Sequence, residues 1–99
     1  MRRLRVLPEA EAELTAAAEW YEQRYTGLGI ELVAVIDRAL ERIQDNPETF
    51  PVWKADYPYR QCVVRRFPYV VFFTFGADDV DIVAFAHAKR RPGYWMARK

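Results

Sequence analysis

The chain has 99 residues, of which 52% are hydrophobic and 29% are charged. We therefore expect one folded domain over residues 1–99 with a buried core rather than a disordered chain. No apolar run approaches the roughly 18 residues that a membrane-spanning helix needs, which excludes a membrane protein. Cys62 is the only cysteine and His87 the only histidine, so an internal disulfide and a structural zinc site are excluded. A cytoplasmic protein without a metal or cofactor is expected.

Charge is unevenly distributed along the chain, although the net charge is only +1. Residues 1–50 contain six basic and ten acidic side chains, whereas residues 51–99 contain nine basic and four acidic ones. The low net charge argues against a general nucleic-acid coat, because such proteins depend on many phosphate contacts. The basic second half still favours an anionic partner.

The first half of the chain predicts a strand followed by two helices. Residues 3–7 alternate basic and apolar side chains, as a short strand does, and Pro8 is typical of a helix start. Apolar residues then recur at helical spacing as far as residues 26–29, where Gly27 is typical of a helix end. A second amphipathic helix ends at Asn46-Pro47. Because the connection is short, we expect the two helices to pack as an antiparallel hairpin.

The second half predicts an irregular segment over residues 47–59 and then three strands. Residues that favour strands dominate 60–66, 69–75 and 80–87, and the short connections between them indicate antiparallel hairpins. Residues 94–98 form at most one helical turn. The predicted fold is an α+β domain in the order β-α-α-β-β-β. In this fold, an N-terminal strand is followed by an α-helical hairpin that packs on a C-terminal antiparallel three-stranded meander, and the chain ends in a short C-terminal tail.

The middle strand of the meander is apolar on both sides, because residues 70–75 do not alternate. Such a strand is normally covered on both faces of the sheet, and the helical hairpin covers only one face. Two explanations remain for the other face. Either the 47–59 segment and Tyr94-Trp95 in the tail cover it, or a partner protein does.

Few residues in the sequence suit catalysis. The chain contains no serine and no glycine-rich phosphate loop, and Cys62 lies within a predicted strand, where a buried, inert thiol is expected. The acidic residues of 78–81 are interpreted as solvated turn residues rather than as a metal site. Reactive groups concentrate in residues 87–98, which contain His87, Tyr94 and four cations.

The meander is expected to bring Arg60, Arg65 and Arg66 close to this C-terminal group on a single exposed concavity. Such a set suits metal-free RNA cleavage, because arginine stabilises the charge of the phosphorane while histidine, lysine or tyrosine transfers protons. It suits equally well the binding of an anionic surface or of an acidic protein tail without any chemistry. The residues alone leave both possibilities open.

Four stretches of the sequence occur in an order and at separations that point to a known family. They are Glu13-Leu14 with Trp20-Tyr21-Glu22, residues 43–47 with Phe50-Pro51, Arg60 with Arg66-Phe67-Pro68-Tyr69, and the group His87, Arg90, Pro92, Tyr94, Trp95 and Arg98. Over nearly its whole length the chain resembles the RelE/ParE toxin superfamily of bacterial type II toxin–antitoxin modules. The ParE-like plasmid-stabilisation branch is the most similar.

The resemblance implies a cytoplasmic toxin that inhibits growth and is neutralised by a cognate antitoxin in a hetero-oligomer. ParE-like members inhibit DNA gyrase, whereas RelE-like members cleave mRNA on the ribosome with Arg, Lys and Tyr side chains. Lysines are few here and the net charge is low for docking on ribosomal RNA, which favours gyrase. The alternatives are a metal-independent, ribosome-dependent endoribonuclease and a non-toxic member that only binds its antitoxin.

The resemblance also suggests which side chains form the site. Matched to the nuclease set, Arg60 and either Arg65 or Arg66 are phosphate ligands, and Tyr94 falls near the terminal tyrosine. The candidate catalytic or target-contact residues are Arg60, His87, Arg90 and Tyr94. The residues predicted to bind the target or the antitoxin are Arg65, Arg66, Lys89, Arg91, Trp95 and Arg98. Trp95 is also expected to anchor the tail on the sheet, and Trp20 and Tyr21 are interpreted as packing residues.

Overall fold

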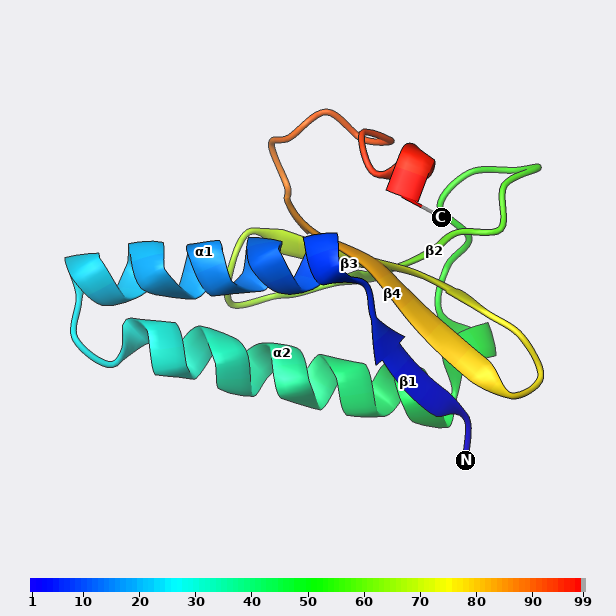
Figure 1. Cartoon of the computed structure of the whole chain (residues 1–99), viewed down its shortest axis with the longest axis horizontal. Coiled ribbons are helices and arrows are strands. Elements are labelled where there is room, and N and C mark those ends of the chain that lie inside the picture. The colour runs from blue at the N-terminus through cyan, green and yellow to red at the C-terminus, as the bar shows by residue number, and fades with distance from the viewer. Residues whose placement is uncertain (99) are drawn as a thin grey trace.

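The computed structural model describes residues 1–98, which form two long helices and a four-stranded sheet (Figure 1). The elements in chain order are β1 (Arg3–Val6), α1 (Pro8–Arg24), α2 (Leu28–Asp45), η1 (Pro47–Thr49), β2 (Arg60–Val63), β3 (Tyr69–Phe75), β4 (Asp79–His87) and η2 (Met96–Arg98). The predicted α+β class and the order of helices and strands are confirmed. No helix among residues 1–98 is both long and apolar enough to cross a membrane.

The two helices are joined by a turn whose chemistry fixes the start of α2. Pro8 begins α1, and acidic side chains follow in its first turn. Gly27 precedes α2 with φ of 90°, a left-handed conformation that favours glycine. The Glu22 carboxylate accepts hydrogen bonds from the backbone N–H groups of Gly27 and Gly29, at 2.8 and 3.0 Å. It therefore satisfies donors that the start of a helix leaves without partners.

The strand order of the sheet is β1-β4-β3-β2, with β1 parallel to β4 and the other neighbours antiparallel. The last three strands form the predicted meander, and β1 extends it to a mixed sheet. β2 ends at Val63, so the expected continuation of this strand to Arg66 is wrong. The backbone N–H of Val64 donates to the carbonyl of Tyr69, and the chain turns at once, which places Arg65 and Arg66 in the turn before β3.

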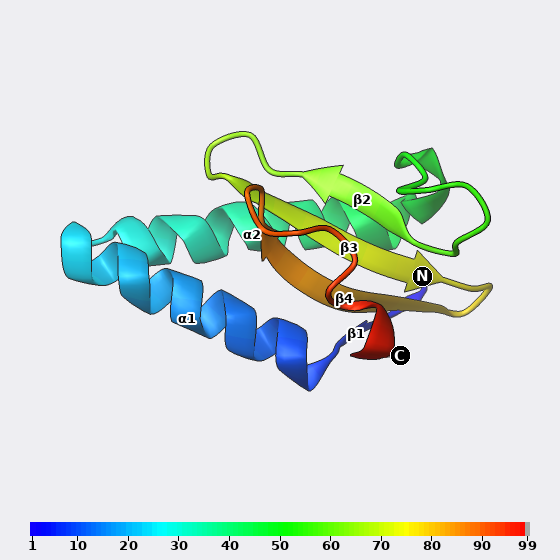
Figure 2. The same cartoon turned by 90° about the horizontal axis from the view of Figure 1, so that it is seen from above.

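Segments of this chain cover both faces of the sheet (Figure 2). On one face, α1 and α2 contribute a core that includes the fully buried Leu32 and Ile43. On the other face, the 47–59 segment and the tail cover the sheet and bury Tyr59 and Trp95. This explains why β3 is apolar on both sides. The alternative that a partner protein covers the second face is wrong.

Cys62 points from β2 into the core on the helix side of the sheet. Burial raises the pKa of its thiol, which disfavours the nucleophilic thiolate. The prediction of a buried cysteine is confirmed.

Candidate functional site

The tail begins where β4 ends and carries most of the predicted site residues. After His87 the chain makes an exposed turn over residues 88–92, which we call the basic turn. Its cations are Lys89, Arg90 and Arg91. Gly93 then adopts φ of 93°, and the chain returns across the second face of the sheet, where Figure 2 shows it above β4.

Trp95 fixes the tail to the sheet. Its buried ring stacks on Phe72 with 4.4 Å between ring centroids, and it meets Tyr59 and Trp53 edge-on at 4.6 and 4.8 Å. Because aromatic rings bury large apolar areas in specific geometries, these contacts favour one position of the tail. The predicted anchoring role of Trp95 is confirmed. Direct contact between Trp95 and a target is incompatible with this conformation, because the ring has no exposed surface.

The carboxylate of Glu13, on α1, contacts charged and phenolic side chains of the tail. Glu13 Oε2 accepts hydrogen bonds from the Tyr94 hydroxyl and from Arg98 Nη2, the latter at 3.0 Å. Glu13 Oε1 accepts hydrogen bonds from Arg98 Nη1 at 2.8 Å and from the backbone N–H of Phe85 at 3.1 Å. Arg90 Nη1 lies 3.8 Å from Oε2. We call Glu13, Arg90, Tyr94 and Arg98 the tail cluster.

The contacts with Glu13 raise the pKa values of Tyr94 and Arg98 in the tail cluster. The side chains of Glu13 and Arg98 are only 15% and 16% exposed. Burial and the hydrogen bond to Glu13 raise the pKa of Tyr94 to about 12, so the phenol keeps its proton at neutral pH. The hydrogen bond to Glu13 also raises the pKa of Arg98. The guanidinium of Arg90 lies over the Tyr94 ring, 3.8 Å from its centroid. The cluster therefore binds the tail to α1, and its Tyr94 and Arg98 side chains are poorly suited to exchanging protons.

A cleft of about 470 Å³ lies beside the tail cluster, between α1 and the end of β4. We call it the aromatic cleft, because Trp20, Tyr21, Tyr69 and His87 line it. Glu13 and Arg90 of the tail cluster also belong to its lining. Tyr21 packs edge-on against Phe67 and Tyr69, which confirms its interpretation as a packing residue. Trp20 packs only in part: its ring meets Tyr21 edge-on with 4.9 Å between centroids and the Arg24 guanidinium lies 3.5 Å from its centroid, but the residue stays 49% exposed.

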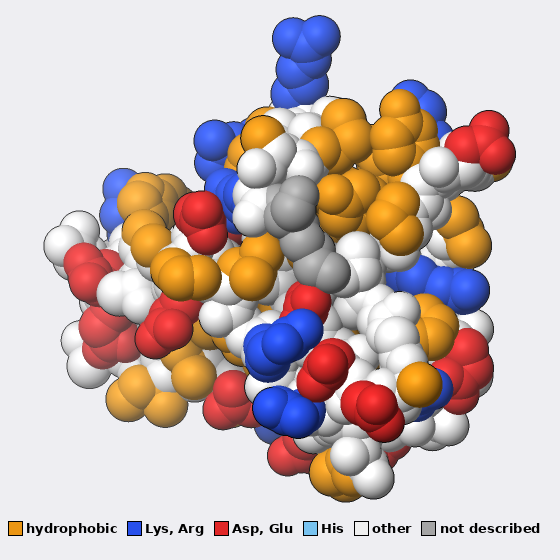
Figure 3. Space-filling model, turned by 45° about the vertical axis from the view of Figure 1, so that its right-hand side comes forward, with side chains coloured by type: hydrophobic (Ala, Val, Ile, Leu, Met, Phe, Trp, Pro, Cys, Tyr) orange, Lys and Arg blue, Asp and Glu red, His pale blue; other side chains and the backbone are white. Residues whose placement is uncertain are grey.

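His87 joins the aromatic cleft to the basic turn. Its Nδ1 accepts a hydrogen bond from the backbone N–H of Lys89 at 3.0 Å, so in the neutral ring Nε2 carries the proton. Lys89 and Arg91 are exposed and form no ion pair with any residue in the described part of the chain. Figure 3 shows a basic side chain standing out at the top of the molecule, where this turn lies. The basic turn thus presents unpaired positive charge to solvent.

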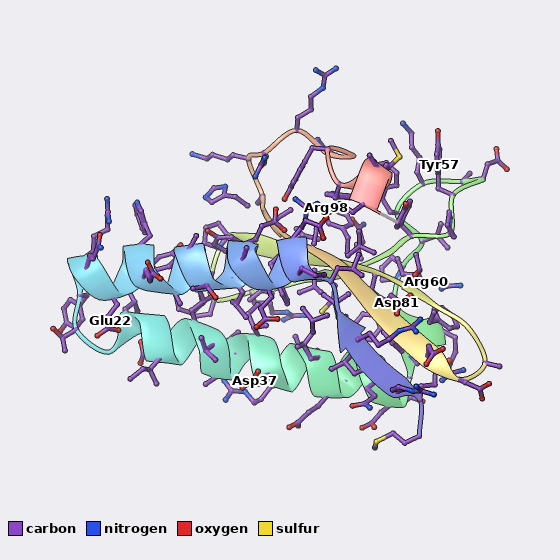
Figure 4. All side chains as sticks on the ribbon, viewed as in Figure 1. Glu22, Asp37, Tyr57, Arg60, Asp81 and Arg98 are labelled. Carbon is purple, nitrogen blue, oxygen red and sulfur yellow. The ribbon has the colours of Figure 1, made fainter. Side chains whose placement is uncertain are left out.

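Arg60 does not join this group. It pairs with Phe73 across the β2–β3 ladder, whereas His87 pairs with Tyr69, so the two residues lie at opposite ends of β3. Arg60 Nη1 instead donates hydrogen bonds to the backbone carbonyls of Glu48 and Phe50, at 3.1 and 2.7 Å. Figure 4 shows Arg60 apart from Arg98. The expected single concavity is therefore wrong, because the pairing register separates its members.

Arg65 and Arg66 lie in the β2–β3 turn beside α2. Arg66 Nη2 forms an ion pair with Glu31 Oε2 at 3.0 Å. Together with Arg38 and Arg42, both arginines line a depression between α2 and the edge of the sheet. This depression shares no lining residue with the aromatic cleft. The predicted cations are thus divided between separate surfaces.

Sequence reasoning missed the role of Glu13. This residue lies three positions after Ala10 and four before Ala17, which are the buried residues of α1. A carboxylate on the buried side of an amphipathic helix needs hydrogen-bond donors or a cation, and that requirement is the signal that points to it. Within residues 1–98, no three His, Cys, Asp or Glu side chains are grouped so that they could hold a metal ion.

Comparison with known proteins finds similarity over most of the chain, both to a family model and to solved structures. A family model described as the ParE toxin of the type II toxin–antitoxin system, parDE, matches residues 4–92. A solved structure described as a chromosomal ParDE TA system from P. aeruginosa is similar with a TM-score of 0.77 and 17% sequence identity, covering 90% of this chain and 98% of that chain. At this identity the structural match shows a shared fold. No curated protein matches the sequence.

Proposed function

The chain belongs to the ParE toxin family of type II toxin–antitoxin systems, and on that basis we propose that it arrests bacterial growth by binding DNA gyrase. Membership of this family implies a cognate ParD antitoxin as a partner. We propose that this antitoxin binds the toxin in the cytoplasm, in a hetero-oligomeric complex, and so prevents contact with gyrase.

The chemistry of the tail cluster supports inhibition by binding over cleavage of RNA. Metal-free RNA cleavage needs side chains that exchange protons near neutral pH and a free cation for the phosphorane charge. Here the pKa of Tyr94 is raised to about 12, and Glu13 neutralises Arg98. Arg60, the other candidate phosphate ligand, holds two backbone carbonyls at the far end of β3. The engagement of Tyr94 and Arg98 by Glu13 is the observation that carries the proposal.

The surface proposed to contact gyrase is the basic turn together with the adjoining aromatic cleft. Lys89 and Arg91 offer exposed, unpaired cations, and His87 and Arg90 line the cleft beside them. The buried Trp95 and the tail cluster hold this surface in a fixed position, which reduces the entropy cost of binding. Arg65 and Arg66, on their separate depression, are proposed to contact an acidic segment of the antitoxin.

The choice between gyrase and ribosome is tested in cells that express the chain with and without its antitoxin. The proposal predicts growth arrest without antitoxin, a loss of negative supercoiling in a reporter plasmid, and no new mRNA ends within ribosome-bound messages. New mRNA ends with unchanged supercoiling would instead establish the endoribonuclease. Normal growth, with the protein shown to be folded and abundant, would indicate a non-toxic protein that only binds its antitoxin.

The contact surface is tested with the double variant Lys89→Ala/Arg91→Ala. We expect it to lose toxicity while it keeps its thermal stability and its antitoxin binding, because neither side chain has an ion-pair partner among residues 1–98. The control, Arg3→Ala/Lys54→Ala, removes the same charge from exposed positions elsewhere together with one exposed ion pair between Arg3 and Asp79, and it should remain toxic. Equal toxicity of the two double variants would show that the basic turn is not the contact surface.

A further inference from the structure

The outer side of the helical hairpin carries a groove that plays no part in the proposed contacts with gyrase or the antitoxin. It lies between α1 and α2, has a volume of about 690 Å³, and is lined by Ala18, Ile30, Val33 and Ala34 with the acidic residues Glu19, Glu22 and Asp37. We call it the hairpin groove. Figure 4 labels Glu22 at the turn end of α1 and Asp37 midway along α2, which marks its length.

Two of the apolar side chains that line the hairpin groove, Ile30 and Val33, do not belong to the core. Ile30 is 73% exposed and Val33 is 36% exposed, although α2 buries Leu32 and Ile36 within the core. Ile30 and Val33 are three residues apart, so they lie on one flank of the helix and form a short apolar ridge. Apolar ridges of this kind, bordered by polar residues, are typical of protein contact surfaces.

The charge around the hairpin groove has one sign. Glu19 on α1 and Asp37 on α2 are exposed on its two sides, and neither forms an ion pair within residues 1–98. Glu22, at the end of the groove, accepts hydrogen bonds from backbone N–H groups, and it forms no ion pair with a cation among residues 1–98. Arg38 and Arg42 line the depression on the other flank of α2. The apolar floor is therefore framed by unneutralised carboxylates.

We propose that the hairpin groove binds a basic amphipathic helix of a partner protein. A groove between two helices accepts a third helix through apolar residues spaced at i, i+3 or i+4, and i+7. Lysine or arginine on the borders of that helix would meet Glu19 and Asp37. A symmetric contact with a second copy of the chain would instead bring like acidic borders together, and an acidic antitoxin segment would be repelled in the same way. The inference is independent of the proposed contact with gyrase.

The proposal is tested by fluorescence anisotropy with the purified full chain and two fluorescein-labelled peptides of about 18 residues, long enough to form a helix. One peptide consists of leucine and lysine with the leucines at helical spacing, and the other replaces every lysine with glutamate. We expect the lysine peptide to bind and the glutamate peptide not to bind. Ile30→Ser/Val33→Ser and Glu19→Gln/Asp37→Asn should each weaken binding at least about tenfold. Binding of both peptides with equal affinity would overturn the proposal.

Two controls separate the groove from general charge attraction. The variant Glu11→Gln/Asp45→Asn removes two exposed carboxylates from other parts of the same helices and should bind the lysine peptide within about twofold of the unaltered chain. A loss as large as that of Glu19→Gln/Asp37→Asn would contradict a specific site. Sedimentation of the chain alone is the second control. A dimer that dissociates in Ile30→Ser/Val33→Ser would show that a second copy fills the groove, and would also overturn the proposal.

Discussion

Glu13 joins three parts of the chain that are distant in sequence. Its carboxylate lies on α1, accepts a hydrogen bond from the backbone of β4, and accepts three more from side chains of the tail. A largely buried carboxylate with this many donors stabilises the fold only while all of its partners are present. The tail that carries the proposed gyrase-binding surface therefore depends on one side chain on α1.

Glu13→Gln is expected to lower the free energy of unfolding by about 2–3 kcal/mol, because it leaves the largely buried Arg98 guanidinium without a counter-charge. Urea unfolding followed by tryptophan fluorescence measures the change, since Trp95 belongs to the same tail. Glu11→Gln, at an exposed position in the first turn of α1, should lower stability by no more than about 1 kcal/mol, because only its interaction with the helix dipole is lost. Equal effects of the two substitutions would show that the tail cluster contributes nothing to stability.

Tyr94 makes the fold sensitive to alkaline pH. Its pKa of about 12 in the folded protein lies above the value of about 10 for an unfolded tyrosine, so the folded state holds the proton more tightly. The stabilisation is complete below pH 10 and is lost as the pH rises from 10 to 12. We expect the unaltered chain to lose more stability across this window than Tyr94→Phe does, measured by urea unfolding at several pH values. Parallel curves for the two proteins would contradict the assignment.

The sequence identifies the arginines as candidate site residues but does not predict the structural role of each one. Arg60 and Arg91 are both basic residues near predicted strand ends, yet Arg60 bonds to two backbone carbonyls and Arg91 is exposed. Which of them supports the fold depends on the pairing register, and a sequence pattern fixes that register poorly. The cations were therefore predictable as a set, whereas their division into separate surfaces was not.

At the scale of elements, the close approach of α1 and α2 depends on a glycine. A Cβ atom on Gly29 would lie 2.4 Å from the backbone carbonyl oxygen of Ala18, so another residue there pushes the helices apart. The Glu22 carboxylate bonds to the Gly29 N–H at this same point. The hairpin turn is therefore set by backbone contact as well as by apolar packing.

Gly29→Ala is expected to destabilise the protein by about 1–3 kcal/mol, as overpacking of a close contact does. Thermal unfolding by circular dichroism measures the effect. Gly76→Ala serves as the control, because a Cβ atom there meets nothing within 4 Å and the backbone φ lies outside the left-handed region. Similar melting temperatures for Gly29→Ala and the unaltered chain would contradict the tight helix contact.

Most elements were predictable from local chemistry. Periodic apolar residues indicated both helices, and the apolar run of β3 was recognised with the bounds Tyr69–Phe75. β2 was predicted too long because residues 64–66 continue a strand-like composition after pairing has ended. The parallel pairing of β1 with β4 joins strands from opposite ends of the chain, and no local pattern specifies such a pairing.

At the scale of the whole molecule, opposite charges occupy different surfaces. The acidic side chains of the helical hairpin border its outer groove, and the cations of the basic turn extend from the other side of the sheet. The chain itself covers both faces of the sheet, so a partner is not needed to complete the core. We therefore expect its partners to be selected by charged surfaces and grooves.

The most direct test of the proposed function is a supercoiling assay with purified gyrase and increasing amounts of the purified chain. We predict that the unaltered chain inhibits supercoiling of relaxed plasmid DNA and that added antitoxin restores it. The variant Lys89→Ala/Arg91→Ala should require at least about tenfold more protein for the same inhibition. Full gyrase activity at every concentration of a folded, growth-arresting chain would contradict the account.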